Sequence, residues 1–192
     1  MPAAANDAPH APWWHVDPAT GRSAAEGTWA VPSAEIVGYL WTYRRFVPTP
    51  VLDRLTEKAL AELRTAPARL DLHDFLAWQR LAGALTGCHR EAVLRRLSAS
   101  LRKTLEAPDA WGRCGAEPIA IAPAPDAPFY DPLADLVTAN LDARIRTRDP
   151  VGGWWPNRRW AAYPEAWEEA RRAWAGFLTV RLLKTFRDFG RL

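Results

Sequence analysis

The chain has 192 residues, with 25 basic and 22 acidic side chains and a formal charge of +3. Apolar residues make up 48% of the sequence and charged residues 24%, which is typical of a globular protein and excludes a disordered tail or a collagen-like chain. Its length is enough for a single domain with a sizeable core, and its unusual feature is the presence of eleven tryptophans.

The distribution of charged and apolar residues excludes several further classes. Arginines are spread along the chain, and many lie one helical turn from a glutamate, as Arg172 does from Glu168, so nucleic-acid binding is not expected. Cys88 and Cys114 form neither a disulfide framework nor a zinc-ligand spacing, so no metal or other cofactor is expected. Without a membrane-length apolar run or a signal-peptide pattern, a cytoplasmic location is expected.

The first half of the chain begins with an irregular stretch and continues as helices. Residues 1–31 contain several prolines and no helical period, which predicts an irregular arm. Apolar residues then recur at helical spacing, with Ser33 and Thr49 as candidate N-caps. The helices expected here are 33–46, 49–63, 71–87 and 89–106.

The second half has the same helical character, interrupted by one long connection. Residues 107–130 contain five prolines, which predicts a crossing loop. Further helices are expected at 131–147, 164–176 and 179–190, where Gly176 ends one and Thr179 caps the next. No segment alternates with period two, so we expect an all-α fold of about seven helices in antiparallel pairs within one domain.

Candidate acid–base residues lie at the start of the third expected helix, in Asp71-Leu72-His73-Asp74. An imidazole next to a carboxylate can exchange protons with a substrate or hold a metal ion. The alternative is structural: Asp71 caps the helix and Asp74 complements its dipole, which leaves His73 without a structural task.

Aromatic residues gather in two places. The first is the N-terminal arm, where Trp13 and Trp14 lie between His10 and His15 and could form the wall of a pocket. The second is a C-terminal cluster that includes Trp154 and Trp155; indole rings suit flat hydrocarbons and stabilise developing cations. In both places the alternative is that the rings only anchor irregular chain or helix ends. Residues 154, 155, 160, 167 and 174 are the tryptophans of the C-terminal cluster.

Two polar residues interrupt the apolar face of the expected helix 131–147. Asn140 and Arg144 fall inside the arc defined by Leu136, Val137 and Leu141. Polar groups on a buried face need hydrogen-bond partners, which either a nearby turn or a bound ligand could supply.

The segment Arg148-Asp-Pro-Val-Gly-Gly-Trp154 resembles the glutamine–tryptophan repeat of squalene and terpene cyclases, with Arg148 where glutamine is usual and Val151 where aspartate is usual. Most of the chain also resembles a group of uncharacterised bacterial proteins with toroid-like architecture. It covers APHAPWW, the pair His73-Asp74, residues 125–140 and the run from Trp160 to Arg191. The resemblance implies the α/α toroid of terpenoid cyclases and protein prenyltransferases.

This resemblance implies a hydrophobic isoprenoid or polyene substrate and its cyclisation or rearrangement. The Asp-x-Asp-Asp and Asp-Asp-x-x-Asp motifs of cyclases do not occur in the sequence, so the family's catalytic residues do not carry over. From the residues themselves, His73 and Asp74 are the expected acid and base. The residues expected to orient or enclose the substrate are His10, His15, Asn140, Trp13, Trp14, Trp154 and Trp155. The alternative is a non-catalytic binding or assembly module, in which a second copy or a partner chain completes the toroid.

Overall fold

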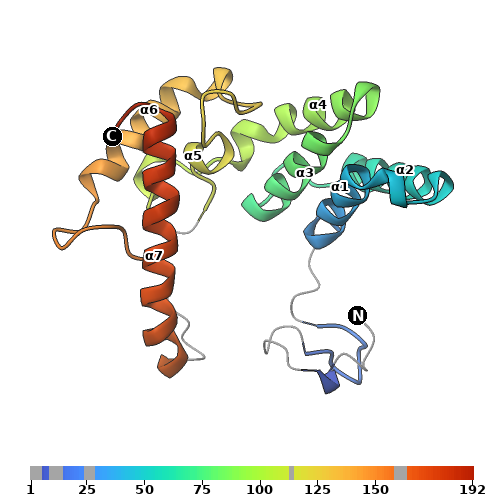
Figure 1. Ribbon diagram of the computed structural model, residues 1–192, viewed down its shortest axis with the longest axis horizontal. Coiled ribbons are helices and arrows are strands. Elements are labelled where there is room, and N and C mark those ends of the chain that lie inside the picture. Colours follow the sequence, from blue (N-terminus) through green and yellow to red (C-terminus); the bar gives the residue numbers. More distant parts are fainter. Residues whose placement is uncertain (1–5, 9–14, 24–28, 113–114, 158–163) are drawn as a thin grey trace. The chain divides into compact units, whose positions relative to one another are not determined.

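Figure 1 shows the fold in a computed structural model, which describes residues 6–8, 15–23, 29–112, 115–157 and 164–192. Seven α-helices account for most of this part of the chain, and no strand occurs within it; one isolated bridge joins Val16 to Ser23. The all-α prediction is therefore confirmed, and the helix packing is compatible with a bundle or a toroid.

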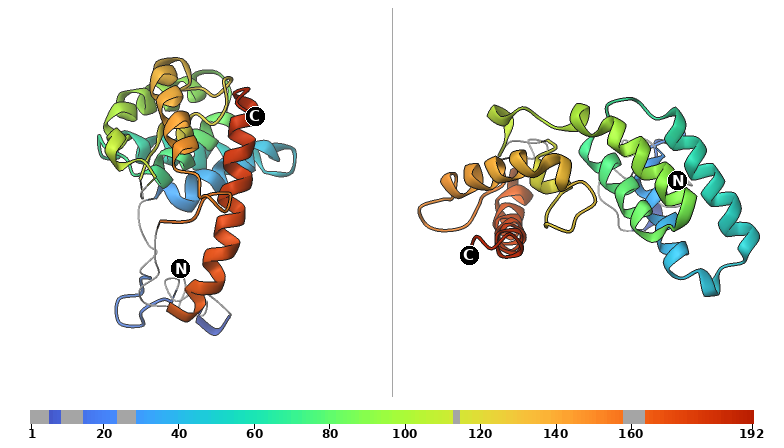
Figure 2. Two further views of the ribbon diagram at one scale, coloured as in Figure 1. Left: turned by 90° about the vertical axis from the view of Figure 1, so that its left-hand side faces the viewer. Right: turned by 90° about the horizontal axis from the view of Figure 1, so that it is seen from above.

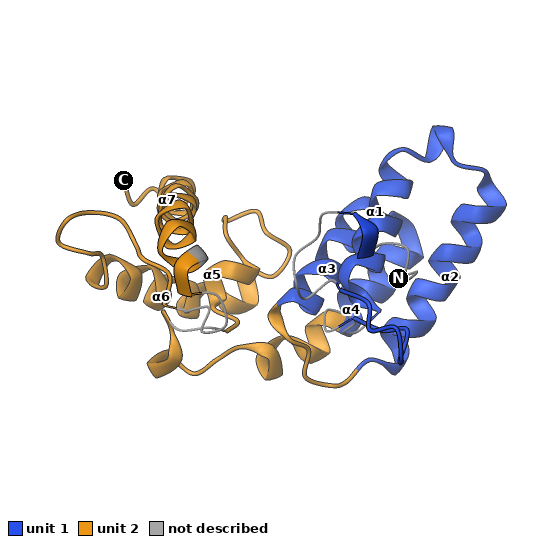
Figure 3. Ribbon diagram, turned by 90° about the horizontal axis from the view of Figure 1, so that it is seen from below, with its two compact units in different colours: residues 1–66, 73–96 blue, residues 67–72, 97–192 orange. Residues whose placement is uncertain are grey.

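The helices form two compact units, coloured separately in Figure 3. The first unit comprises residues 1–66 and 73–96, and the second comprises residues 67–72 and 97–192. Helix α4 (Gly87–Thr104) begins in the first unit and ends in the second.

The first unit is built from α1 (Glu35–Thr42), α2 (Thr49–Thr65), α3 (Leu72–Ala84, from His73 onward) and the start of α4. Tryptophans hold its helices together: Trp78 is buried and stacks on Trp29 with ring centroids 5.7 Å apart, and Trp41 Nε1 donates to Thr56 Oγ1 at 2.8 Å. A Cβ on Gly38 would lie 3.4 Å from Leu81 Cα, so α1 and α3 pack closely at this glycine.

Two expected caps in this unit are wrong. Ser33 follows a kink at Val31, whose backbone is extended (φ −107°, ψ 120°), and the residue at the N-cap position of α1 is Ala34. Thr49 is the first residue of α2, preceded by Pro48, and does not cap it. Helix α1 is also shorter than expected, because the backbone leaves the helical region at Tyr43 and continues as a 3-10 turn, Arg44–Phe46.

The second unit contains α5 (Pro118–Ile121), α6 (Ala134–Arg146), α7 (Pro164–Asp188) and 3-10 turns at Pro108–Ala110 and Asp131–Leu133. Helix α5 lies within the proline-rich segment and packs against α6. Measured over the described residues, no helix combines the length and the apolar character needed to cross a bilayer. The buried apolar residues of this core include Leu97, Leu101, Ile121, Phe129, Leu133, Val137, Leu141, Trp154, Leu182 and Phe186.

The expected break between two C-terminal helices is wrong. Residues 164–188 form one continuous helix, α7, visible as the long red helix in Figure 2. A glycine inside a helix costs only about 1 kcal/mol relative to alanine, and Gly176 has none of the positive φ that would end one. Thr179, expected as a cap, instead accepts a hydrogen bond from the backbone N–H of Trp154 at 3.1 Å.

The turn that donates this hydrogen bond depends on a glycine. Gly153 has φ +79°, and a Cβ built there would lie 2.5 Å from Thr179 Oγ1. Both the backbone conformation and the contact with α7 therefore exclude a side chain at this position.

We predict that Gly153→Ala and Gly176→Ala have opposite effects on stability. Gly153→Ala should lower the free energy of unfolding by about 1–3 kcal/mol, because it adds strain and a contact that is too close. Gly176→Ala should raise it by about 0.5–1 kcal/mol, because Gly176 is inside a helix and an added Cβ meets nothing within 4 Å. Thermal unfolding at low protein concentration measures both; a loss of stability in Gly176→Ala would contradict a continuous α7.

Candidate functional site

The expected acid–base pair lies at the start of α3 with its two side chains in different surroundings. Asp74 is 5% exposed and occupies the first turn of the helix, where a carboxylate complements the helix dipole. His73 is exposed. The structure therefore places the carboxylate in the protein interior and the imidazole at the surface.

Most of the aromatic arm, including His10, Trp13 and Trp14, lies outside the described residues. His15 is exposed, and its Nε2 is 3.5 Å from Asn6 Nδ2. The Asn6 amide also bonds both backbone groups of Val16, donating to its carbonyl and accepting from its N–H, each at 2.8 Å. The Asn6 side chain thus links two described parts of the arm through the backbone of Val16.

The two neighbouring tryptophans of the turn differ in burial. Trp154 is 5% exposed, its Nε1 donates to the carbonyl of Arg144 at 2.8 Å, and its ring centroid is 5.6 Å from that of Phe186. Trp155 is 41% exposed, and the guanidinium of Arg171 lies 4.6 Å from its ring centroid. Trp154 consequently joins the end of α6 to α7, whereas Trp155 faces outward.

Asn140 belongs to a buried polar network that the sequence indicated only in part. Its side chain is fully buried; Oδ1 accepts the N–H of Ile119 at 3.2 Å, and Nδ2 donates to Glu117 Oε2 at 3.1 Å. Both ends of the amide are thus used to hold the first turn of α5 against α6.

The centre of this network is Glu117, which sequence reasoning missed. Arg144 donates to it in a bidentate arrangement, from Nε to Oε2 at 2.9 Å and from Nη2 to Oε1 at 2.6 Å. The N–H of Gly112 donates to Oε1 at 2.6 Å. With Asn140 this makes four hydrogen bonds to a carboxylate whose side chain is 7% exposed. The only sequence signal for it is an acid directly before Pro118, one of three acids in the proline-rich segment.

A pocket of about 160 Å³ lies next to this network in the second unit. Glu117 and Arg144 form its polar side, and Arg181 and Thr185 of α7 line the opposite side. Because Glu117 and Arg144 neutralise each other and the carboxylate is saturated with donors, this arrangement is suited to holding α5, α6 and their loop together.

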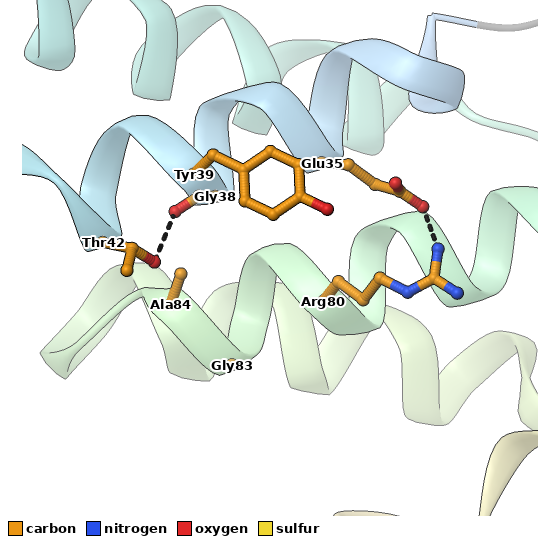
Figure 4. Close-up of a pocket in the computed structure, with 7 residues that line it drawn as sticks. All are labelled: Glu35, Gly38, Tyr39, Thr42, Arg80, Gly83 and Ala84. Atoms are coloured by element: carbon orange, nitrogen blue, oxygen red, sulfur yellow. Dashed lines mark hydrogen bonds and ion pairs between the residues drawn. The ribbon is translucent and has the colours of Figure 1, made fainter.

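A second pocket, of about 220 Å³, lies between α1 and α3 in the first unit (Figure 4). Its floor consists of small residues, among them Gly38 and Gly83, and the ring of Tyr39 forms one wall. An ion pair between Glu35 and Arg80 lies at one end. The pocket is therefore a shallow groove with an apolar middle and a charged end.

Neither pocket contains any of the predicted site residues. Their linings include no tryptophan, histidine or cysteine. In addition, the portion of the chain with described coordinates has no group of three His, Cys, Asp or Glu side chains arranged to hold a metal ion. Among the predicted residues that the structure describes, Asp74 and Trp154 are buried, and His15, His73 and Trp155 are exposed.

Comparison with known proteins adds no assignment. No protein-family model, no curated protein and no solved structure matches this chain. The site must therefore be interpreted from its own geometry.

We predict that Glu117→Ala is strongly destabilising, because it leaves the Arg144 guanidinium and the Asn140 amide without their carboxylate. Removing one partner of a buried ion pair costs about 3–5 kcal/mol, and the partial exposure of Arg144, 21%, places the expected loss near the lower value. The matched control is Asp142→Ala. Asp142 lies on α6 like Arg144, but its ion pair with Arg191 is partly exposed, so its loss should cost less than about 1 kcal/mol. Equal losses in urea unfolding would contradict the structural role of Glu117.

The pair at the start of α3 gives a separate prediction. Asp74→Ala should lower the free energy of unfolding by about 1–3 kcal/mol, because the carboxylate is buried in a first helical turn. His73→Ala should change it by less than about 0.5 kcal/mol, because His73 is exposed. Differential scanning calorimetry measures both, and an unchanged melting temperature for Asp74→Ala would argue against a structural carboxylate.

Proposed function

We propose that this chain is a non-catalytic protein-interaction module that binds an amphipathic helix of a partner protein along α1, through apolar contacts and an acidic flank of the partner. The observation that supports this function is a row of large exposed side chains on one unit. Ile36 is 49% exposed, Tyr39 60%, Tyr43 58% and Phe46 70%.

The spacing of this row matches one side of α1. Ile36 and Tyr39 lie three residues apart on one face of α1, and Tyr43, the residue directly after the helix, continues the row four positions on. Val37 and Gly38 of the same helix are buried on the other side. Exposed tyrosines in a continuous row are typical of protein interfaces, because each combines a large apolar ring with a hydroxyl group.

The groove beside this row is suited to one side chain of the partner. An added Cβ on Gly83 would meet no atom within 4 Å, so the floor of the groove is open. Thr42 Oγ1 already donates to the carbonyl of Gly38 at 3.1 Å, so this hydroxyl is used within α1. An apolar side chain anchored between Tyr39 and this floor would extend the contact made by the row.

The charges near the row favour an acidic partner. Arg44 and Arg45 follow Tyr43 directly, both are exposed, and the Arg45 guanidinium lies 4.5 Å from the ring centroid of Phe46. Arg80 at the other end of the groove is 59% exposed and is paired with Glu35. Carboxylates flanking the apolar face of a partner helix would therefore meet positive charge at the Arg44–Arg45 end.

The isoprenoid-binding function implied by the cyclase resemblance stays a prediction. Pockets for small organic ligands usually occupy about 300–1,000 Å³, and both described pockets are smaller, at about 160 and 220 Å³. Neither lining includes the tryptophans or the acid–base pair on which that function depends. The interaction module agrees better with these features.

The proposed function predicts selective binding of acidic helices. Two synthetic amphipathic peptides of about 18 residues, with leucine at helical spacing and either glutamate or lysine elsewhere, are titrated against the protein by fluorescence anisotropy. The glutamate peptide should bind at least tenfold more tightly, and Tyr39→Ser/Tyr43→Ser should weaken it by about tenfold or more. Reversing charge with Arg44→Glu/Arg45→Glu should remove the preference.

The control for this experiment is Val151→Ser, which replaces a 92%-exposed apolar side chain in the other unit and should leave peptide affinity unchanged. Equal affinity for the two peptides, or full binding by the double tyrosine variant, would overturn the proposal.

A further inference from the structure

Helix α7 carries apolar residues on two sides. Its inner side packs into the second unit through Leu182 and Phe186, which are 8% and 3% exposed, and Trp167 nearer its start is 4% exposed. Apolar residues also project from the opposite side, where Val180 is 69% exposed and Leu183 39%. A helix that packs by one face only has polar residues on the other, so this second side is a candidate interface.

The exposed side of α7 follows a regular pattern that we call the outer seam. Its six positions are separated by four, three, four, three and four residues, the spacing at which side chains of one helix line up along a second helix. All six are exposed, and an added Cβ on Gly176 would meet nothing within 4 Å. The outer seam consists of Glu169, Ala173, Gly176, Val180, Leu183 and Arg187.

The outer seam is complementary to itself when reversed. Its positions fall in pairs equidistant from Leu178, so two antiparallel copies of α7 would place residue 169 opposite 187, residue 173 opposite 183, and residue 176 opposite 180. Each pair is complementary: Glu169 meets an arginine, Ala173 a leucine and Gly176 a valine. Small side chains opposite large ones allow close packing, and opposite charges at both ends define the register.

The neighbouring side chains are compatible with this pairing. Phe177 lies next to the centre of the seam and is 60% exposed, so the two copies of this ring come near each other across the two-fold axis. At the basic end, Lys184 and Arg187 both donate to the carboxylate of Asp188, which lowers the pKa of that carboxyl. Arg187 uses Nε and Nη2 for this contact, so its remaining N–H groups can reach a glutamate opposite.

We propose that the outer seam of α7 binds the same surface of a second copy of this chain in an antiparallel arrangement. This inference goes beyond the proposed function, because it concerns a different helix and a different unit from the surface on α1, and either proposal can fail alone. One helix face buries less surface than the roughly 1,200–2,000 Å² of a standard interface, so the dimer should be weak and concentration-dependent.

The test is analytical ultracentrifugation of the whole chain between about 1 and 300 µM, a range that covers weak dimers. The unmodified chain should dimerise as the concentration rises. Glu169→Arg places two arginines opposite each other, and Arg187→Glu places two glutamates opposite each other. Each variant alone should therefore dimerise at least about tenfold more weakly than the unmodified chain. A one-to-one mixture of the two variants restores both charge pairs and should recover the dimer.

Two further variants serve as controls. Glu168→Arg makes the same charge change one residue away from the seam and should leave the dimer unaffected, whereas Val180→Glu should abolish it. Helical circular dichroism verifies that each variant is folded. A chain that is monomeric throughout the range would overturn the inference, and so would a dimer unchanged by Val180→Glu or a mixture that associates no better than its components.

Discussion

The ion pair between Glu117 and Arg144 is the interaction on which the second unit depends. A carboxylate inside a protein is tolerated only when donors replace its water, and here backbone, amide and guanidinium groups supply four of them. The same residue, Arg144, accepts the indole N–H of Trp154 at its backbone carbonyl. Trp154 in turn contacts Phe186 and Thr179 of α7. The buried carboxylate of Glu117 is therefore connected to α7 through Arg144 and Trp154.

The fold class could be predicted because helical spacing of apolar residues is a local property of the sequence. The polar pair on α6 was also recognisable, since Asn140 and Arg144 interrupt an apolar face and require partners. Their partner was not recognisable, because Glu117 is 23 residues from Asn140 and lies in a segment without any period. Thr179 illustrates the same limit: its residue type favours a helix cap, but its hydroxyl accepts a hydrogen bond from a residue 25 positions away.

The tryptophans that the structure describes differ in burial. Trp78 and Trp154 are buried and join elements within their units, and Trp41 does the same through its hydrogen bond to Thr56. Trp155 and Trp174 remain 41% and 47% exposed. Aromatic enrichment therefore does not by itself identify a ligand cavity, because a large ring with one polar atom is equally effective at joining a helix end to its neighbour.

The order in which the chain visits its two units has a consequence for synthesis. Residues 67–72 belong to the second unit but precede the last part of the first, and the chain changes unit once more within α4, between Arg96 and Leu97. All residues of the first unit have been synthesised once residue 96 has left the ribosome. Residues 67–72, including the buried Leu70, can pack only after the later residues 97–192 of their unit have been synthesised. No single cut of the chain yields both units intact, since each is assembled from two separate stretches of sequence.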